Sequence, residues 1–167
     1  MNEIIELMDI VSDTDEVIGQ IDRSLLGLGK NPGFRVINAF LMNGNGELWI
    51  PRRHSNKQFF PLHLDASVGG HVMSGETYEE ALVREAEEEV RLKVTTFKQI
   101  GRLTPHDDNV SAFMKVYLIR CDVTPEYNTD DFSGYYWLKP GELLDRIRGG
   151  DKAKGDLEII VKKVFLA

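Results

Sequence analysis

Short runs in which apolar residues alternate with polar ones or cluster together fill the first half of the chain, and they predict β-strands there. A polar turn at residues 12–15 separates the first two runs, which predicts an N-terminal hairpin over residues 4–22. Residues 43–46 (NGNG) favour positive φ and predict a tight turn into a strand that Pro51 should end. The expected strands are residues 4–11, 16–22, 35–42, 47–51 and 66–72.

The second half of the chain mixes helical and strand patterns. Thr77 with Glu80 three residues later forms a capping-box pattern, which predicts a helix over residues 77–90. The remaining expected elements are strands at residues 92–103, 111–120 and 135–138, a turn at 105–109, a helix at 140–148 and a last helix after Gly155, so that the C-terminal helices span 140–166. No repeat or long linker divides the chain. The order of elements predicts one domain over residues 1–167, of the α/β class, with helices packed on the faces of a mixed sheet.

The predicted helix at residues 77–90 carries acidic side chains on the face that should be buried. At about 100° per residue, Glu85 and Glu89 fall within its apolar stripe and Glu88 lies at the edge. Burying an ionised carboxylate costs free energy, and like charges repel at i, i+4. A divalent cation with hard oxygen ligands would compensate for both costs. The alternative is a solvated acidic face on which Arg84 pairs with Glu88 as a weak surface ion pair.

Glycines in front of this helix favour the cation site. Gly69 and Gly70 end a predicted strand, Gly75 precedes the helix, and Glu76 lies at the helix entrance. Glycine permits a close approach of the backbone to another group. A glycine-bearing loop followed by a helix with inward acids is suited to placing a metal ion beside a phosphate chain.

These residues resemble the Nudix box of the Nudix hydrolases, here residues 70–92. The match comprises Gly70, then Glu76 after five residues, then after seven more the run Arg84-Glu85-Ala86-Glu87-Glu88-Glu89. One position departs from the pattern, because Arg91 stands where the family has a glycine that eases the helix exit. The resemblance implies an α/β/α sandwich with a central mixed β-sheet.

The resemblance also implies roles for individual residues. Glu85, Glu88 and Glu89 would coordinate Mg²⁺ or Mn²⁺, with the backbone carbonyl of Gly69 as a further ligand. Arg84 would pair with Glu76 and hold the glutamates in register. Glu88 or Glu89 would accept the proton of the attacking water. A further acid from outside the box is expected among Asp107, Asp108, Glu126, Asp130 and Asp131.

Three longer segments resemble the branch that contains the isopentenyl-diphosphate isomerases and their hydrolase relatives: residues 8–23, 48–71 and 135–144. The isomerases need a cysteine at the position of Gly69, and the single cysteine of this chain, Cys121, lies elsewhere. Two metal-binding histidines of the isomerases match Gly27 and Phe34, so that only His71 remains. An isomerase is therefore the disfavoured alternative.

Basic residues after the strand at 47–51 are candidates for binding the substrate. Arg52, Arg53 and Lys57 are candidate phosphate ligands, and the positions of Arg53 and Lys57 contact the diphosphate in the isomerase-like branch. The alternative is a solvated basic turn. His71 is either a phosphate or metal contact or a satisfied histidine at a strand end. Phe59 and Phe60 are expected to pack in the core or the loop in preference to stacking on a base.

The net charge of −7 disfavours a nucleic-acid polymer or an anionic membrane as the partner, but it permits a small anionic substrate bound through a cation. One cysteine excludes an internal disulfide, and no signal-peptide or membrane-spanning pattern is present, so a cytoplasmic protein is expected. The sequence predicts metal-dependent hydrolysis of a diphosphate linkage in a nucleoside di- or triphosphate or a nucleoside diphosphate joined to a sugar. A non-catalytic nucleotide-binding Nudix module is the further alternative.

Overall fold

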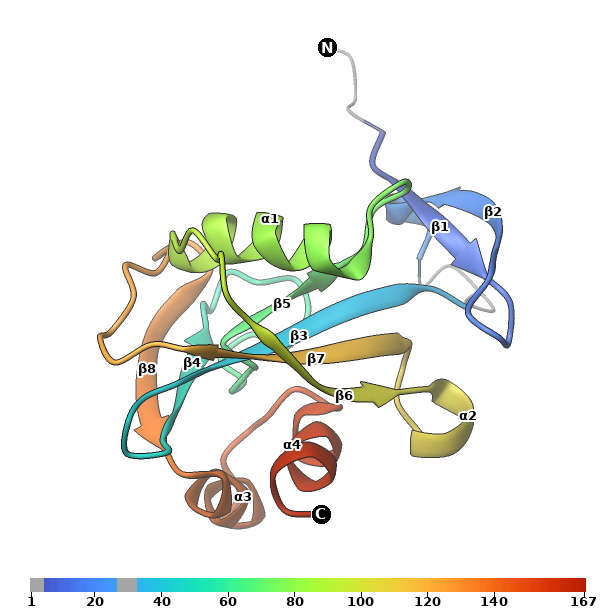
Figure 1. Cartoon of the computed structure of the whole chain (residues 1–167). Helices are drawn as coiled ribbons and strands as arrows, with labels where there is room; N and C mark the ends of the chain where they lie inside the picture. Colours follow the sequence, from blue (N-terminus) through green and yellow to red (C-terminus); the bar gives the residue numbers. More distant parts are fainter. Residues whose placement is uncertain (1–4, 27–32) are drawn as a thin grey trace.

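The computed structural model describes residues 5–26 and 33–167, and its core is a six-stranded mixed sheet (Figure 1). The strand order is β6-β7-β3-β4-β8, and β5 also pairs with β3. Strands β3 and β7 are parallel, whereas the other pairs in this sheet are antiparallel. The elements of the sheet and its helices are β3 Arg35–Met42, β4 Leu48–Arg53, β5 Val68–His71, α1 Tyr78–Val90, β6 Lys98–Leu103, α2 Pro105–Asp108, β7 Phe113–Arg120, β8 Phe132–Leu138, α3 Pro140–Arg148 and α4 Leu157–Phe165.

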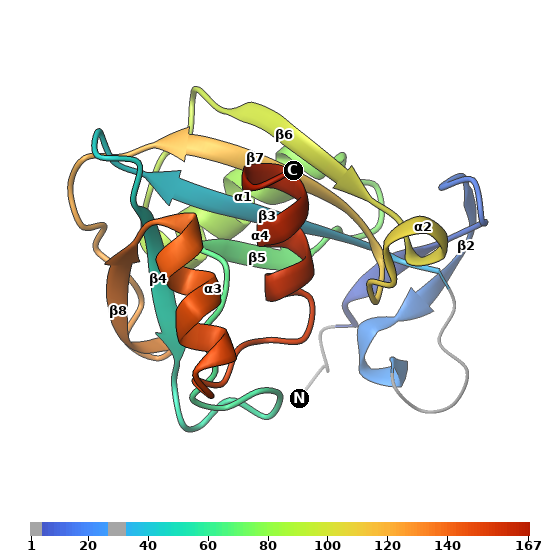
Figure 2. The ribbon, with the colours of Figure 1, turned by 90° about the horizontal axis from the view of Figure 1, so that it is seen from below.

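Helices cover both faces of the sheet, as Figures 1 and 2 show. Successive side chains of a strand point to opposite faces. Ile37, Ala39 and Leu41 of β3 therefore pack with the buried face of α1, whereas Phe40 packs with the buried residues of α3 and α4. The expected α/β/α arrangement with a mixed central sheet is confirmed.

A separate two-stranded sheet lies at the N-terminal end, formed by β1 Leu7–Val11 and β2 Val17–Asp22. A short 3-10 turn, Arg23–Leu25, follows β2. This agrees with the predicted hairpin, although its expected first residue, residue 4, lies outside the described residues, as does Gly27. The assignment of residues 1–167 to one domain stays a prediction.

Three predicted elements differ from the structure. Strand β4 continues through Pro51 to Arg53. It pairs with β3 only at Leu48, so Pro51 faces no β3 acceptor and its missing N–H costs no hydrogen bond there. Residues 92–97 pair with no strand among the described residues, so the strand predicted at 92–103 is limited to β6. The predicted turn at 105–109 is one helical turn, α2, which the side chain of Thr104 caps.

Helix α1 begins and ends through local backbone chemistry. The Thr77 hydroxyl accepts from the Glu80 N–H at 3.1 Å, and the Glu80 carboxylate accepts from the Thr77 N–H at 2.8 Å, which confirms the capping box. Arg91 ends the helix in the left-handed conformation with φ 49°. A non-glycine residue therefore occupies the exit at which glycine is favoured. Across residues 5–26 and 33–167, no helix is long and apolar enough to cross a membrane.

Candidate active site

Strand β5 contains two consecutive glycines, Gly69 and Gly70, that leave space on opposite faces of the sheet. A Cβ on Gly70 would lie 2.7 Å from Cγ of Glu85 and closer still to its carboxyl group. A Cβ on Gly69 would point to the other face, 3.3 Å from Oδ1 of Asn38. Glycine at position 70 therefore lets the Glu85 side chain lie directly against the backbone of β5.

The carboxylates of α1 gather along this strand. The Gly69 N–H donates to Oε2 of Glu89 at 3.0 Å, and the Glu85 side chain is only 14% exposed. Glu88 points outward, with 59% of its side chain exposed. We refer to Glu85, Glu88 and Glu89 together with Gly69 and Gly70 as the acidic edge. Glu85 and Glu89 point inward, as predicted, and Glu88 lies at the border of the apolar stripe of α1.

Burial dominates the electrostatics of the acidic edge. It raises the pKa of Glu89 well above its ordinary value, and the neighbouring charge of Glu85 acts in the same direction. Burial also raises the pKa of Glu85, although the hydrogen bond from Arg84 opposes that shift. The two carboxylates therefore lack sufficient positive charge around them to offset their loss of solvent.

The Arg84 guanidinium pairs with several acceptors at the acidic edge and around it. Its Nε donates to Oε1 of Glu76 at 2.6 Å, and its other nitrogens reach Oε1 of Glu85 at 2.7 Å and Oε2 of Glu88 at 3.5 Å. It also donates to the carbonyl of His71 at 3.0 Å. Arg84 thus joins the helix entrance, the end of β5 and the middle of α1, which suits it to fixing the position of Glu85.

The donor set of the acidic edge fits a hard divalent cation. Its side-chain donors are carboxylate oxygens, and the glycine backbone forms a cradle beside Glu85 that a larger residue would fill. Within the described residues, no group of three or more His, Cys, Asp or Glu side chains is already gathered into a metal cage. Because Glu88 is exposed and only loosely paired with Arg84, its side chain is free to complete such a set.

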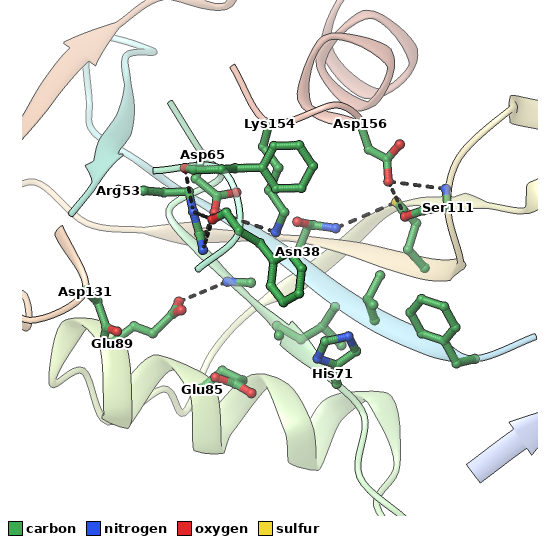
Figure 3. Close-up of a pocket in the computed structure, with 18 of the residues that line it drawn as sticks. Asn38, Arg53, Asp65, His71, Glu85, Glu89, Ser111, Asp131, Lys154 and Asp156 are labelled. Carbon is green, nitrogen blue, oxygen red and sulfur yellow. Dashed lines mark hydrogen bonds and ion pairs between the residues drawn. The ribbon is translucent and has the colours of Figure 1, made fainter. Parts of the chain in front are cut away.

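A cavity of about 730 Å³ extends from the acidic edge around β5 to the face beneath α4. Figure 3 shows Glu85 and Glu89 on one side and Arg53, Asp65 and Lys154 on another, with Asn38 on the same side of β5 as Lys154. Ser111 and Asp156 lie at the far end of the same view. The cavity therefore combines a carboxylate wall, an opposing wall with basic groups and a neutral polar floor.

Comparisons with known proteins show the family of this chain. The family model described as the NUDIX domain matches residues 33–157. The chain belongs to the NUDIX domain family. An uncharacterised Nudix hydrolase of Nostoc is 48% identical over 167 residues, which cover 99% of both chains. A Nudix hydrolase of Deinococcus radiodurans is 47% identical over 162 residues, covering 96% of this chain and 94% of that protein. A crystal structure from the same organism has a TM-score of 0.91 at 47% identity, covering 96% of this chain and 99% of that one. The protein is accordingly an enzyme of the Nudix hydrolase type.

Three of the four predicted substrate-binding residues line the cavity of this Nudix enzyme: Arg53, Lys57 and His71. Arg52 is not among the lining residues. Its guanidinium instead holds Asp151 through two bonds, at 3.0 and 2.9 Å. Arg52 therefore pairs with Asp151 and does not line the cavity, in contrast to its predicted role as a substrate ligand.

The lining basic residues are themselves paired. Arg53 donates to Asp65 at 3.0 Å and to the carbonyls of Phe59 and Phe60 at 2.9–3.1 Å. Lys57 pairs with Asp131. Arg53 therefore fixes the shape of the loop at the cavity mouth, and Lys57 brings Asp131 to the cavity.

Phe59 and Phe60 lie at the cavity and outside the core, with 64% and 44% of their surfaces exposed. Phe60 packs edge-on against His63 within the same loop, with ring centroids 5.5 Å apart. His71 is largely enclosed, and burial lowers its pKa to about 4, aided by the charges of Arg23 and Lys154. His71 is therefore a neutral imidazole at pH 7, which argues against its acting as a cationic phosphate ligand.

Of the five candidate acids outside the Nudix box, Asp131 is the one that lines the cavity. Figure 3 places it beside Glu89. The sequence did not single out several other lining residues: Asn38, Asp65, Ser111, Lys154 and Asp156. Asp65 offered one signal, because an acidic residue within an apolar run predicts a buried ion pair, which it forms with Arg53.

Proposed function

We propose that this Nudix enzyme hydrolyses a diphosphate linkage in a nucleoside di- or triphosphate with the help of Mg²⁺ or Mn²⁺. A nucleoside diphosphate joined to a sugar is the second substrate class. The observation that carries the proposal is the acidic edge, where Glu85 and Glu89 lie together in partly enclosed positions and share too little cationic charge. An additional cation at this place would relieve both the burial cost and the mutual repulsion.

The side chains of Glu85, Glu88 and Glu89 would hold the metal ion, with the carbonyl of Gly69 as a further ligand. When bound, the ion supplies charge neutralisation of the diphosphate and a lowered pKa for a coordinated water. Arg84 keeps Glu85 in place through its simultaneous bonds to Glu76 and Glu85. Glu76 and Arg84 therefore act as positioning residues.

Proton transfer from the attacking water falls to a carboxylate of the same helix, Glu88 or Glu89. The Glu89 carboxylate is fixed by the Gly69 N–H, whereas Glu88 is exposed and held only at 3.5 Å by Arg84. A carboxylate that is held in place is suited to act as the general base. A mobile carboxylate is suited to act as a metal ligand that moves into place when substrate binds. Comparison of Glu88→Gln with Glu89→Gln in single-turnover assays will separate the two roles.

The opposing wall suits the anionic part of such a substrate. Lys154 lines the cavity there, and it approaches Asp65 at 3.6 Å while remaining 37% exposed. An ammonium group with unused N–H directions can bind a phosphate oxygen. The volume of about 730 Å³ lies within the range of small-molecule sites, roughly 300–1,000 Å³.

The isomerase alternative lacks its acid. Gly69 occupies the position at which the isomerases need a cysteine, and Cys121 bonds to the Val123 carbonyl outside the cavity lining. The likeness to that branch rests on the sequence segments alone and stays a prediction. A non-catalytic binding module is disfavoured because Arg84, Glu85, Glu88 and Glu89 are all present.

The experiment is a substrate panel with the full chain in Mg²⁺, Mn²⁺ or excess chelator. Nucleoside di- and triphosphates, nucleoside diphosphate sugars and isopentenyl diphosphate are assayed for release of phosphate or nucleoside monophosphate. The proposal predicts metal-dependent release from a nucleotide and none from isopentenyl diphosphate. Conversion of isopentenyl diphosphate to its isomer, or nucleotide release that persists in chelator, would contradict it.

A further inference from the structure

Asn38 is a buried carboxamide whose hydrogen-bonding capacity is largely unused. It lies in the middle of β3 and is 7% exposed. Its Nδ2 approaches Sδ of Met114 at 3.7 Å, and a thioether is a weak acceptor. Among the described residues, no donor bonds to Oδ1 of Asn38. Oδ1 of Asn38 is not among the fully buried atoms without a partner, so it is open to the cavity, where a bound ligand could donate to it.

The structure keeps this carboxamide accessible from the cavity. Asn38 and Gly69 are cross-strand partners in β3 and β5, so their side-chain positions share one face of the sheet. A methyl group at position 69 would lie 3.3 Å from Oδ1 of Asn38. Because Gly69 has no side chain, the route from the acidic edge to Asn38 stays open.

The compartment around Asn38 combines apolar side chains with a few polar ones, among them Lys154, Ser111 and Asp156. Alternation along β3 points Asn38 away from α1 and toward α4. The neighbouring lining residues on this face include Val36, Met114, Leu157 and Ile160. Figure 3 shows the Asn38 side chain extending into the cavity, on the opposite side of β5 from Glu85. The apolar members of this lining suit the faces of a flat group, and the polar members suit its edge.

We propose that this compartment takes the nucleobase of the substrate and that Asn38 reads the edge of that base. A carboxamide offers one acceptor and two donors, the complement of the donor and acceptor pairs along a base edge. The diphosphate would lie at the acidic edge, on the other side of β5 from Asn38, where a metal ion would bind it. This inference rests on the proposed function and adds the group that selects the substrate.

The direct test is NMR of the side-chain amide of Asn38 in the wild-type protein, without metal. Adenosine, guanosine, cytidine and uridine 5′-monophosphates are added in turn, and ribose 5-phosphate serves as the base-free control. The proposal predicts that at least one nucleotide shifts the Asn38 NH₂ signals and that ribose 5-phosphate does not. No shift with any nucleotide, or equal shifts with ribose 5-phosphate, would overturn it.

Kinetics with matched variants supply the second test. Asn38→Leu keeps the side-chain size but removes both donor and acceptor, and Asn45→Leu changes an exposed asparagine at a hairpin turn. Across the four nucleoside 5′-diphosphates, Asn38→Leu should reduce the spread of kcat/KM by about tenfold, and hydrolysis of methyl diphosphate should change less than that of the preferred nucleotide. Asn45→Leu should preserve the spread. An unaltered spread in Asn38→Leu would overturn the proposal.

Folding and function are separated within the same experiment. A merely structural Asn38 would show its loss in thermal unfolding, with all substrates affected equally, and Asn38→Asp supplies a second variant that retains acceptors. If nucleoside monophosphates shift the Asn38 signals but no nucleoside di- or triphosphate is hydrolysed, the proposed function fails and the binding inference stands. If nucleotides are hydrolysed while the Asn38 signals do not move, only this inference fails.

Discussion

Two clusters of charged side chains in this enzyme differ in their charge balance. At the acidic edge, Arg84 pairs with Glu76, Glu85 and Glu88, whereas the donor to Glu89 among the described residues is the Gly69 N–H. In the second cluster, which we call the arginine clamp, Arg52 and Arg146 both bond to the single carboxylate of Asp151. Tyr136 completes the clamp, with the Arg146 guanidinium 3.8 Å above its ring. One cluster has excess anions and the other has excess cations around one anion.

The pKa values follow this difference. The hydrogen bond from Arg52 lowers the pKa of Asp151 to about 2, with Arg146 adding to the effect. Burial raises the pKa values of Glu85 and Glu89, because the nearby cation is insufficient to offset it. A carboxylate that cations surround stabilises the fold by itself, whereas carboxylates with too few cations at a cavity indicate a place for a cationic ligand.

Glu89→Gln should give the largest effect on activity. Removing one carboxylate from the acidic edge should lower turnover about a hundredfold or more through lost metal activation, with the fold intact or slightly more stable. Steady-state kinetics and urea unfolding measure the two quantities. The matched control is Glu87→Gln, an exposed glutamate on the outer face of the same helix, which should leave both unchanged. Equal activity in the two variants would contradict the assigned role.

Gly70→Ala tests the cradle of the acidic edge. The new methyl group would displace the Glu85 carboxyl, so kcat should fall about tenfold. The stability loss should be about 1 kcal/mol, because the displaced atoms belong to a flexible side chain. Gly134→Ala is the control, since a Cβ at Gly134 meets nothing within 4 Å. Full activity of Gly70→Ala would show that Glu85 need not lie against β5.

Asp151→Asn tests the arginine clamp, and here the effect should fall on stability. The folded pKa of about 2 lies below the ordinary value, so the ionised carboxylate contributes stability above about pH 4 that is lost as the pH falls toward 2. At pH 7 the variant should lose about 2 kcal/mol of unfolding free energy, and the deficit should shrink between pH 4 and pH 2.

The control for the clamp is Asp145→Asn, an exposed residue whose 3.5 Å pair with Arg148 should contribute less than about 0.5 kcal/mol. Urea unfolding across pH measures both variants, and kcat should be unchanged in each. A loss of activity in Asp151→Asn that exceeds its loss of folded protein would mean that the clamp belongs to the site.

Arg91→Gly should give the smallest effect. Arg91 adopts φ 49° at the end of α1, a conformation that glycine adopts without steric cost. The variant should gain about 0.5–1 kcal/mol of stability, whereas Arg91→Ala should gain nothing. Urea midpoints for the two variants decide between a backbone effect and the removal of a charge.

The sequence predicted most of the fold because local patterns specify it. The capping box of α1 and the alternation in β3 depend on residues a few positions apart, and both are found as expected. The prediction that Pro51 ends its strand was wrong. Proline is tolerated in β4 because the pairing of β3 with β4 stops at Leu48, and that pairing is tertiary structure that no local pattern encodes.

The candidate site was predictable only where its residues are close in sequence. The acids of α1 and the glycines before them share one segment, and their period placed Glu85 and Glu89 inward. Asn38 and Lys154 join the cavity through the pairing of β3 with β5 and the return of the chain before α4, which no local pattern encodes. Arg52 and Arg53 are adjacent in sequence, and alternation along β4 sends them to different partners.

The central claim is that the acidic edge binds a divalent cation, and titration of the metal-free protein with Mn²⁺ tests it most directly. Calorimetry in the absence of substrate should show saturable binding in the wild type and in Glu87→Gln, weakened about tenfold or more in Glu85→Gln and Glu89→Gln. Absence of binding in the wild type, or equal affinity in all four proteins, would contradict the account.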